Sequence, residues 1–260
     1  MRPFKILGIA ALITVAAFGL SAFIKSNHSK KMKADNKGFA VIELFTSEGC
    51  SSCPPADALV ARVEKESKDQ PVYILAYHVD YWNSLGWKDA FSNPDYSKRQ
   101  SAYAHYLHLP QIYTPQIVVN GKTEFVGSEE GTLRNAIKTS LQKESPVQFS
   151  LNIASVSKGQ AELKYVTAGT DKNTALLVAV VQKNAQSKVE RGENAGHTLS
   201  HVQIVRKLQS VSLKENSGTV NVSLPNGFDP KEWEIVGILQ NTSSGAITGA
   251  ARAEGMPATI

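Results

Sequence analysis

The stretch that decides the fold is residues 41–57, VIELFTSEGCSSCPPAD. Together with Phe39 and Ala40 it opens with an apolar run, residues 39–46, that is typical of a buried strand. A helix is expected to start near Cys50. Its apolar face has the spacing i, i+3, i+4 and i+7 and consists of Ala56, Leu59, Val60 and Val63. Pro54 and Pro55 fit only the first turn of such a helix, where a missing N–H group costs nothing.

Downstream of this stretch, strand and helix signals alternate as far as residue 144. An Asn-Gly pair at residues 120–121, between two apolar runs, is the strongest short hairpin signal in the chain. The other elements are expected at residues 72–79, about 95–107, 116–120, 122–126 and, for a last helix capped by Ser128, from there to about 141. The order β-α-β-α-β-β-α predicts an α/β domain at residues 39–144.

The pattern changes after Pro146. Short alternating runs, separated by turn signals rich in Asn and Gly, predict a β-rich, sandwich-like domain at residues 145–260. Strands are expected at 147–154, 160–167, 174–183, 208–213, 218–224 and 233–240. Residues 187–202 are too polar and too rich in glycine for a core strand. We expect Arg191, Glu193 and Asn194 in this segment to form a hydrogen-bonded loop between the two domains.

Cys50 and Cys53 are the two cysteines of the chain and carry its clearest chemical signal. A structural staple is disfavoured, because a loop of four residues contributes only about 2 kcal/mol in the chain-entropy account. A metal site lacks a second Cys-x-x-Cys pair, and zinc usually takes four ligands. A redox pair fits best, because the positive end of a helix favours a thiolate. Cys50 is then expected to be the more exposed, attacking thiol, and Cys53 the resolving thiol.

Several longer stretches resemble one bacterial family. They are VIELFTSEGCSSCPPAD, AYHVDYWNSLGWKDAFSNPDYSKRQSAYA, YTPQIVVNG, VERGENAGHTLSHVQIVRKL and ILQNTSSGAITGAAR. The chain is similar to a secreted, thioredoxin-like family catalogued as domain of unknown function 1223. The resemblance implies a thioredoxin-like domain with a β-rich extension, and it implies roles for Cys50, Cys53 and a cis Thr114–Pro115 bond that faces them.

Other side chains are candidates for auxiliary roles. Many thioredoxins carry a buried Asp six residues before the first cysteine; here that position is Leu44, and the neighbouring Glu43 is a candidate for proton transfer. His78 and Asp80 leave the end of the second strand, on the edge where Cys50 is expected. The alternative is that His78 makes a structural hydrogen bond and that the nearby aromatic residues anchor the insert. His197 and His201 have a spacing that suits a metal only within a helix, so no metal site is assigned.

The N-terminus carries the basic excess of the chain. Residues 1–40 hold seven basic residues and one acidic residue, whereas the remainder holds 21 basic and 22 acidic residues. The body is therefore close to neutral, and a nucleic-acid partner is disfavoured. The 19 uncharged residues Ile6 to Ile24 would span roughly 28 Å as a helix, close to the thickness of a bilayer core. Residues 1–38 are thus expected to form an export signal or membrane anchor with a Lys-rich tether.

These observations predict an exported protein of the periplasm or cell envelope, either anchored or released by cleavage. Its expected activity is thiol–disulfide exchange on protein thiols, with a Cys50–Cys53 disulfide and no cofactor. Two alternatives stay open. One is a non-catalytic binding module with a stable disulfide, and the other is a protein that handles a soft metal such as copper through its thiolates.

Overall fold

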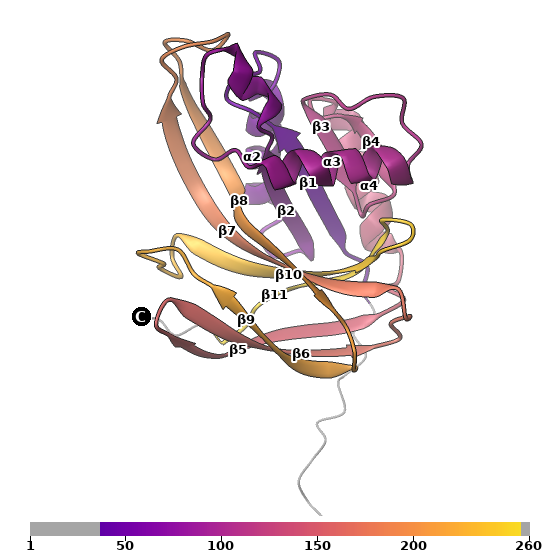
Figure 1. Cartoon of the computed structure of the whole chain (residues 1–260). Helices are drawn as coiled ribbons and strands as arrows, with labels where there is room; N and C mark the ends of the chain where they lie inside the picture. The colour runs from indigo at the N-terminus through magenta and orange to yellow at the C-terminus, as the bar shows by residue number, and fades with distance from the viewer. Residues whose placement is uncertain (1–36, 256–260) are drawn as a thin grey trace, which may run out of the picture. The chain divides into compact units, whose positions relative to one another are not determined.

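Strand β1 (Ala40–Thr46), the apolar run before the cysteines, is fully buried inside a sheet of eight strands. The computed structural model describes residues 37–255 (Figure 1). The large sheet has the order β11-β10-β7-β8-β2-β1-β3-β4, and a separate sheet has the order β5-β6-β9. The fold is therefore of mixed α/β type, with one large and one small sheet.

The elements up to residue 142 follow the predicted order. They are β1, α2 (Pro54–Glu66), β2 (Val72–His78), the short helix η1 (Tyr81–Leu85), α3 (Pro94–Tyr106), β3 (Gln116–Val119), β4 (Thr123–Val126) and α4 (Glu130–Gln142). Local chemistry explains their limits. The Asn93 side chain accepts the Asp95 N–H at the start of α3, and Asn120 and Gly121 both take the positive φ that a tight β3–β4 hairpin requires.

The expected helix start near Cys50 is wrong. Cys53 is the N-cap residue of α2, and Pro54 and Pro55 fill its first positions. The residues before it form a turn, in which the Cys53 N–H donates to the Cys50 carbonyl at 3.2 Å. Both cysteines therefore lie in the turn that leads into the helix.

The β-rich part of the chain contributes strands to both sheets. The small sheet contains β5 (Gln148–Ser157), β6 (Gln160–Ala168) and β9 (Ser217–Ser223), whereas the large sheet receives β7 (Thr174–Lys188), β8 (Thr198–Ser212), β10 (Trp233–Asn241) and β11 (Ile247–Arg252). The large sheet thus includes strands from both sides of residue 144. Residues 187–202 were expected to hold no core strand, and the structure differs from this at both ends: β7 reaches Lys188 and β8 begins at Thr198, in one long hairpin that includes the buried His201.

The two parts of the large sheet meet at a narrow joint. β2 and β8 are paired in parallel at a single position, Ala76 with Ile204. Next to it, Gln203 is buried and takes a positive φ of 54°. Helix α3 bridges the joint, since the Tyr96 hydroxyl donates to the Val205 carbonyl at 2.8 Å.

Three apolar clusters hold these layers together. Helix α3 packs on one face of the large sheet, where Tyr96 and Tyr103 contact residues of β1 and β2 as well as of β7 and β10. Helices α2 and α4 pack on the opposite face of β1, through Leu59, Val63 and Leu133. The small sheet covers alternate residues of β7 and β10 that point away from α3. The α3 side is therefore one continuous core shared by both parts of the chain.

No helix among residues 37–255 is both long enough and apolar enough to cross a membrane. The predicted membrane segment Ile6–Ile24 lies outside the described residues, as does almost all of the predicted tether.

Candidate functional site

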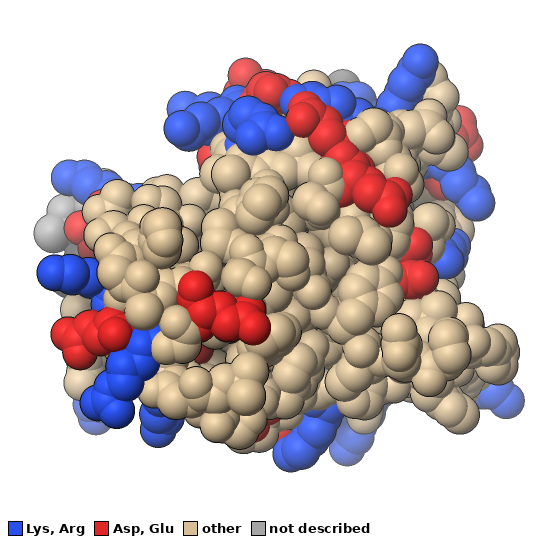
Figure 2. Space-filling model, turned by 90° about the horizontal axis from the view of Figure 1, so that it is seen from above, with Lys and Arg blue, Asp and Glu red and all other residues tan. Residues whose placement is uncertain are grey.

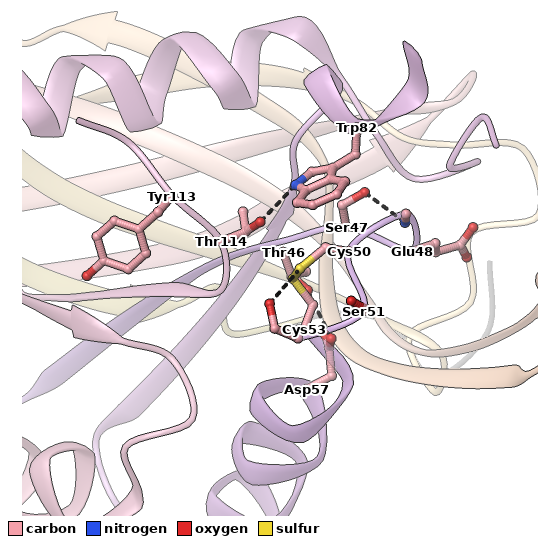
Figure 3. The surroundings of a disulfide bond; sticks show 12 residues. Thr46, Ser47, Glu48, Cys50, Ser51, Cys53, Asp57, Trp82, Tyr113 and Thr114 are labelled. Carbon is pink, nitrogen blue, oxygen red and sulfur yellow. Dashed lines mark hydrogen bonds between the residues drawn. A yellow bond between two sulfur atoms is a disulfide. The ribbon is translucent and has the colours of Figure 1, made fainter. Parts of the chain in front are cut away.

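Cys50 and Cys53 form a disulfide at the carboxyl end of β1, with their Cα atoms 5.4 Å apart (Figure 3). The chain arrives there through a tight turn, in which the Cys50 N–H donates to the Ser47 carbonyl at 3.2 Å. The Ser52 hydroxyl lies 3.4 Å from the Cys50 sulfur. The disulfide is thus placed directly in front of the first turn of α2, at the positive end of the helix dipole.

The two cysteines do not differ in exposure. Cys50 and Cys53 are both 0% exposed, while Ser51 and Ser52 between them are exposed. The expectation that Cys50 is the more accessible thiol is therefore wrong for the disulfide form. The reason is that loops from elsewhere in the chain cover the turn.

One cover is Trp82, from η1. Its ring lies against the disulfide in Figure 3, and its indole N–H donates to the Thr114 hydroxyl at 2.8 Å. A Cβ atom on Gly49 would lie 3.1 Å from the Trp82 Cβ, so glycine lets the tryptophan approach the turn. The Thr114–Pro115 bond is cis, as predicted. Gly127 separates Pro115 from Ala56, because an added Cβ would lie 3.0 Å and 3.1 Å from theirs.

The other cover is the loop between β7 and β8. The Asn194 side-chain amide donates to the carbonyls of Glu48 and Cys50, at 2.9 and 3.0 Å. The Glu193 carboxylate accepts the Ser51 N–H at 3.0 Å, and hydrogen bonds from Ser51 hold the pKa of Glu193 below its usual range. This loop was expected to make hydrogen bonds to the first part of the chain, and it makes them to the disulfide turn itself.

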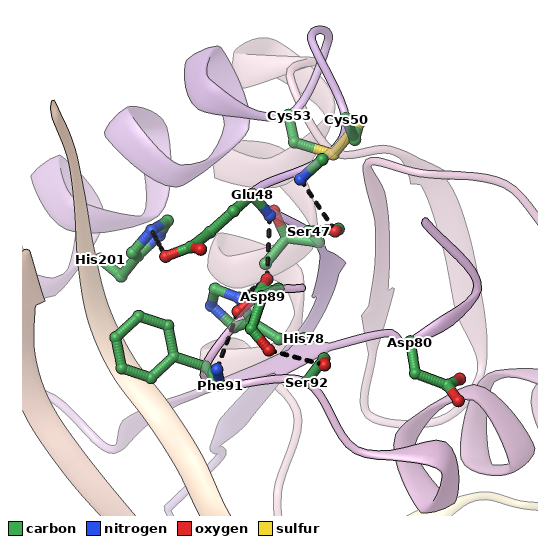
Figure 4. A network of polar contacts seen from close by, with 12 residues as sticks. Ser47, Glu48, Cys50, Cys53, His78, Asp80, Asp89, Phe91, Ser92 and His201 are labelled. Carbon is green, nitrogen blue, oxygen red and sulfur yellow. Dashed lines mark hydrogen bonds and ion pairs between the residues drawn. A yellow bond between two sulfur atoms is a disulfide. The ribbon is translucent and has the colours of Figure 1, made fainter. Parts of the chain in front are cut away.

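His78 and Asp80 make hydrogen bonds to different parts of the chain. The buried His78 donates from Nδ1 to Asp89 Oδ2 at 2.7 Å, so it makes the structural hydrogen bond that was the alternative (Figure 4). Burial acts to raise the pKa of Asp89, but the charge and hydrogen bond of His78, with two backbone N–H groups, lower it overall. Asp80 accepts a hydrogen bond from Ser97 of α3. The structure brings Asp80 to α3 and not to the sulfur atoms.

Glu43 is buried on the α3 side of β1, whereas Leu44 faces α2. Arg99 donates to its carboxylate at 2.7 Å, and the Tyr103 hydroxyl donates to its other oxygen. Burial opposes the charge of Arg99, but the attraction of Glu43 raises the pKa of the guanidinium well above its usual value. The carboxylate of Glu43 is thus neutralised by α3.

Three ionisable side chains lie behind the disulfide turn, a position that sequence reasoning did not predict for any of them. Glu48, Asp57 and His201 are 0%, 6% and 2% exposed, and they come from the turn after β1, from α2 and from β8. His201 Nε2 lies 3.6 Å from Glu48 Oε1, and His201 Nδ1 lies 3.5 Å from Asp57 Oδ1. Burial acts to lower the pKa of His201, but the two carboxylates outweigh it and raise the pKa to about 9. We call these three residues the acid–histidine cluster.

A sequence signal for part of this cluster did exist. Asp57 follows Cys53 by four residues and adjoins the apolar face of α2, so the helix carries it toward the core. Its carboxylate accepts the Thr46 hydroxyl at 2.9 Å. His201 had no such signal, because it lies in a polar run whose strand pairing is not local.

Two cavities help to locate accessible surface. A groove of about 440 Å³ runs between α2 and residues 198–202 of β8, and its lining includes Pro54, Asp57 and His201. A larger cavity of about 590 Å³ lies between α4 and the start of β1, and Cys50 and Cys53 are not among its lining residues. The groove is therefore the cavity that adjoins the candidate site.

His197 and His201 do not act as a pair. His197 is exposed at the end of the β7–β8 loop, while His201 is buried in β8. Within residues 37–255, no group of three or more His, Cys, Asp and Glu side chains is arranged to hold a metal ion.

Solved structures resemble this fold over most of its length. A crystal structure of protein AGR_C_4864 from Agrobacterium tumefaciens is 28% identical, with a TM-score of 0.65, and the match covers 84% of this chain and 96% of that chain. HBP35 of Porphyromonas gingivalis is 16% identical, with a TM-score of 0.59, and the match covers 83% of this chain and 74% of that chain. The second likeness concerns the fold alone. No curated protein matches the chain.

A family model matches residues 41–240, a range that includes the disulfide turn, the acid–histidine cluster and the β7–β8 loop. The match extends over well more than half of the chain. The chain therefore belongs to the family described as "Protein of unknown function (DUF1223)".

Proposed function

We propose that this protein is a thiol–disulfide oxidoreductase that acts on protein thiols through Cys50 and Cys53. The observation that carries the proposal is the position of the disulfide, directly before the first turn of α2. The helix dipole stabilises negative charge at such a place. Cysteines at helix N-termini commonly have pKa values lowered from about 8.5 to roughly 3.5–7.5. Reduction of the bond would thus leave a thiolate suited to exchange.

The arrangement around β1 supports a thioredoxin-like description of residues 39–144. β2 lies parallel to β1 on one side, and β3 and β4 follow as antiparallel strands on the other. Helices α2 and α3 cover opposite faces of β1. The Pro115 backbone enters β3 beside the first turn of α2. This order of elements agrees with the β-α-β-α-β-β-α order expected from the strand and helix signals.

The surface around the disulfide favours a polypeptide substrate. Figure 2 views the end of the molecule that carries the β7–β8 tip, and the basic side chains gather at the rim of this view. Tyr81 and Leu85 of η1 and Ile112 before Thr114 are exposed apolar side chains, on the two segments that the Trp82–Thr114 hydrogen bond joins. Such a surface suits apolar polypeptide segments better than a nucleic acid. We assign the protein to the space outside the cytoplasmic membrane, where disulfides persist.

A second candidate is a binding module whose disulfide stays oxidised. The complete burial of both cysteines favours it, because substrate thiols must reach a sulfur atom for exchange. A soft-metal protein is the third candidate. Metal analysis of reduced protein, purified without oxygen, tests it directly, with copper as the probe.

Trapping of mixed disulfides tests the leading proposal. In intact cells, Cys53→Ser should accumulate disulfide-linked partners, because Cys50 attacks and the resolving thiol is gone. Cys50→Ser should accumulate almost none, and the double serine variant is the control that can form no link. If neither single variant traps a partner, and the wild-type disulfide does not equilibrate with glutathione, the binding module takes the place of the oxidoreductase.

A further inference from the structure

The acid–histidine cluster places a positive charge between two buried carboxylates. His201 lies within 3.6 Å of Glu48 and within 3.5 Å of Asp57, through opposite ring nitrogens. Neither ring nitrogen has a hydrogen-bond partner within residues 37–255, and Glu48 Oε1 has none either. Buried polar atoms are normally hydrogen-bonded, so atoms that are held by charge alone call for a further explanation. The members of the cluster are placed to exchange a proton.

Asp57 connects this cluster to the second cysteine. The Asp57 N–H donates to the Cys53 carbonyl at 3.1 Å, so the two residues are one helical turn apart. The Thr46 hydroxyl donates to Asp57 Oδ2 at 2.9 Å. Figure 3 shows Thr46 and Asp57 beside Cys53, on the inner side of the disulfide. The Thr46 hydroxyl thus holds the Asp57 carboxylate on the side of α2 where Cys53 lies.

Other ionisable groups lie near His201. His78 stacks edge-on with His201 at 4.8 Å between ring centroids, and it is held by Asp89. Arg206 lies over the Phe91 ring, 5.0 Å from its centroid, and that ring also contacts His201. Arg62 and Lys65 of α2 line the outer part of the adjoining groove. The groove reaches Asp57 and His201, so water can restore a proton to them.

We propose that His201 is a positioning residue of the dithiol site, which holds a proton between Glu48 and Asp57 and passes it through Asp57 and Thr46 to Cys53. The inference rests on the proposed function. It makes the β7–β8 hairpin part of the redox site, because His201 belongs to β8.

The chemistry balances as follows when a substrate dithiol is oxidised. A substrate thiolate attacks the Cys50 sulfur, the Cys50–Cys53 bond breaks, and its electron pair stays on Cys53. The His201 imidazolium gives its proton to the Asp57 carboxylate, and Asp57 passes that proton through the Thr46 hydroxyl to the Cys53 thiolate. The second substrate thiolate then attacks the substrate sulfur of the mixed disulfide, and Cys50 leaves as a thiolate. The substrate loses two electrons, the cysteine pair gains them, and His201 becomes neutral.

The charge of His201 supports this role. With a pKa of about 9 its imidazole carries the proton at neutral pH, because two carboxylates face it in a buried place. Above that pH the donor is lost. The rate of substrate oxidation should therefore fall as the pH rises through about 9.

His201→Gln in the full chain tests the proposal. The readout is the rate of oxidation of a model peptide dithiol from pH 6 to 10. A positioned acid or base commonly contributes about 10²–10⁴-fold, and one that acts through a second group belongs near the lower end. We expect a loss of about 10–100-fold at pH 7 and no further fall near pH 9. The matched control is His197→Gln, on the same hairpin but exposed, which should keep the wild-type profile.

Two further variants keep the test decisive. Thr46→Val keeps the side-chain shape and removes the hydroxyl, so its rate of peptide oxidation should fall by the same factor. It takes the place of His201→Gln in the test if that variant fails to fold. Combining His201→Gln with Cys53→Ser should leave trapping by Cys50 intact, because no proton is then needed at residue 53. If the oxidation rate and pH profile are unchanged in His201→Gln or Thr46→Val while trapping is intact, the proposed role of His201 is overturned and the oxidoreductase function is kept. Absence of trapping in Cys53→Ser would instead remove the oxidoreductase function.

Discussion

Two buried carboxylates near the end of β1 are held in opposite ways. Glu43 faces α3, where Arg99 and Tyr103 donate to its two oxygens. Gln240 of β10 closes the group, since it accepts from Arg99 at 3.1 Å and donates to the Tyr103 hydroxyl at 2.9 Å. The charge of Glu43 is therefore matched, and each of its oxygens has a donor.

Glu48 is only half satisfied. Its Oε2 accepts the Trp87 indole N–H at 2.7 Å, but its Oε1 has no hydrogen bond and faces His201 at 3.6 Å (Figure 4). A closed group such as that of Glu43 fastens the sheet to α3 and β10. An open group such as that of Glu48 retains atoms that can take or give a proton. Both groups contribute to stability, but only that of Glu48 retains buried oxygen and nitrogen atoms without a hydrogen bond in the described part of the chain.

The largest loss of folding stability is expected from Arg99→Met. This change leaves the Glu43 carboxylate buried without its counter-charge, and breaking a buried pair in this way costs about 3–5 kcal/mol. Urea unfolding measures the loss. Adding Glu43→Gln should recover part of it, because the uncompensated charge is then removed. If the pair belonged to the redox site instead, the folded single variant would also lose peptide oxidation at temperatures where it is stable.

A control for that experiment is Arg134→Met. Arg134 pairs with Glu66 and Glu130 on the exposed surface between α2 and α4. Solvent screens such pairs, so the loss of stability should be far smaller than that of Arg99→Met.

The second largest effect is the pH-dependent loss of folding stability expected from His201→Gln. The pKa of His201 is raised in the folded state to about 9, above its ordinary value of 6.5. Its contribution to stability is therefore complete below pH 6.5 and disappears as the pH rises through about 9. Wild type should exceed His201→Gln by on the order of 2–3 kcal/mol at pH 6, and the two should converge by pH 10. Urea unfolding at pH 6, 8 and 10 measures the gap, and a constant gap would contradict the charge assigned to His201.

The smallest effect is expected from Asn194→Ala. The change removes two hydrogen bonds from the carbonyls of Glu48 and Cys50, at a cost of about 1–2 kcal/mol. The disulfide turn should also become more accessible, so dithiothreitol should reduce it faster. Glu193→Gln is the matched change in the same loop, and it should leave stability nearly unaltered. Equal reduction rates in wild type and Asn194→Ala would show that the loop does not protect the disulfide.

Much of the α/β region could be predicted because its signals are local. Asn93-Pro94 starts α3, Asn120-Gly121 turns between β3 and β4, and the two prolines after Cys53 mark the first turn of α2. Each signal acts within a few residues of where it is read. The start of α2 was placed too early because the turn through Ser51 and Ser52 carries no local signal that separates it from the helix.

The parts of the fold that could not be predicted depend on pairing between strands that are distant in the sequence. The outer halves of β7 and β8 carry mostly polar side chains, and in the sheet they pair only with each other from Asn184 to Lys188. Their pattern therefore resembled a loop. Which sheet a strand joins is decided by its neighbours, so β7 and β10 were assigned to a separate sandwich. His201 was overlooked as a partner of the disulfide turn for this reason.

The joint between β2 and β8 has a mechanical consequence. Thirteen residue pairs join β7 to β8, whereas a single pair, Ala76 with Ile204, joins β8 to β2. Under tension between residues 37 and 255, the backbone ladder offers least resistance at this joint. Its opening would draw His201 and Asn194 away from the cysteines while each group of strands stays intact. Stretching would thus uncover the sulfur atoms and separate them from their proton donor in one movement.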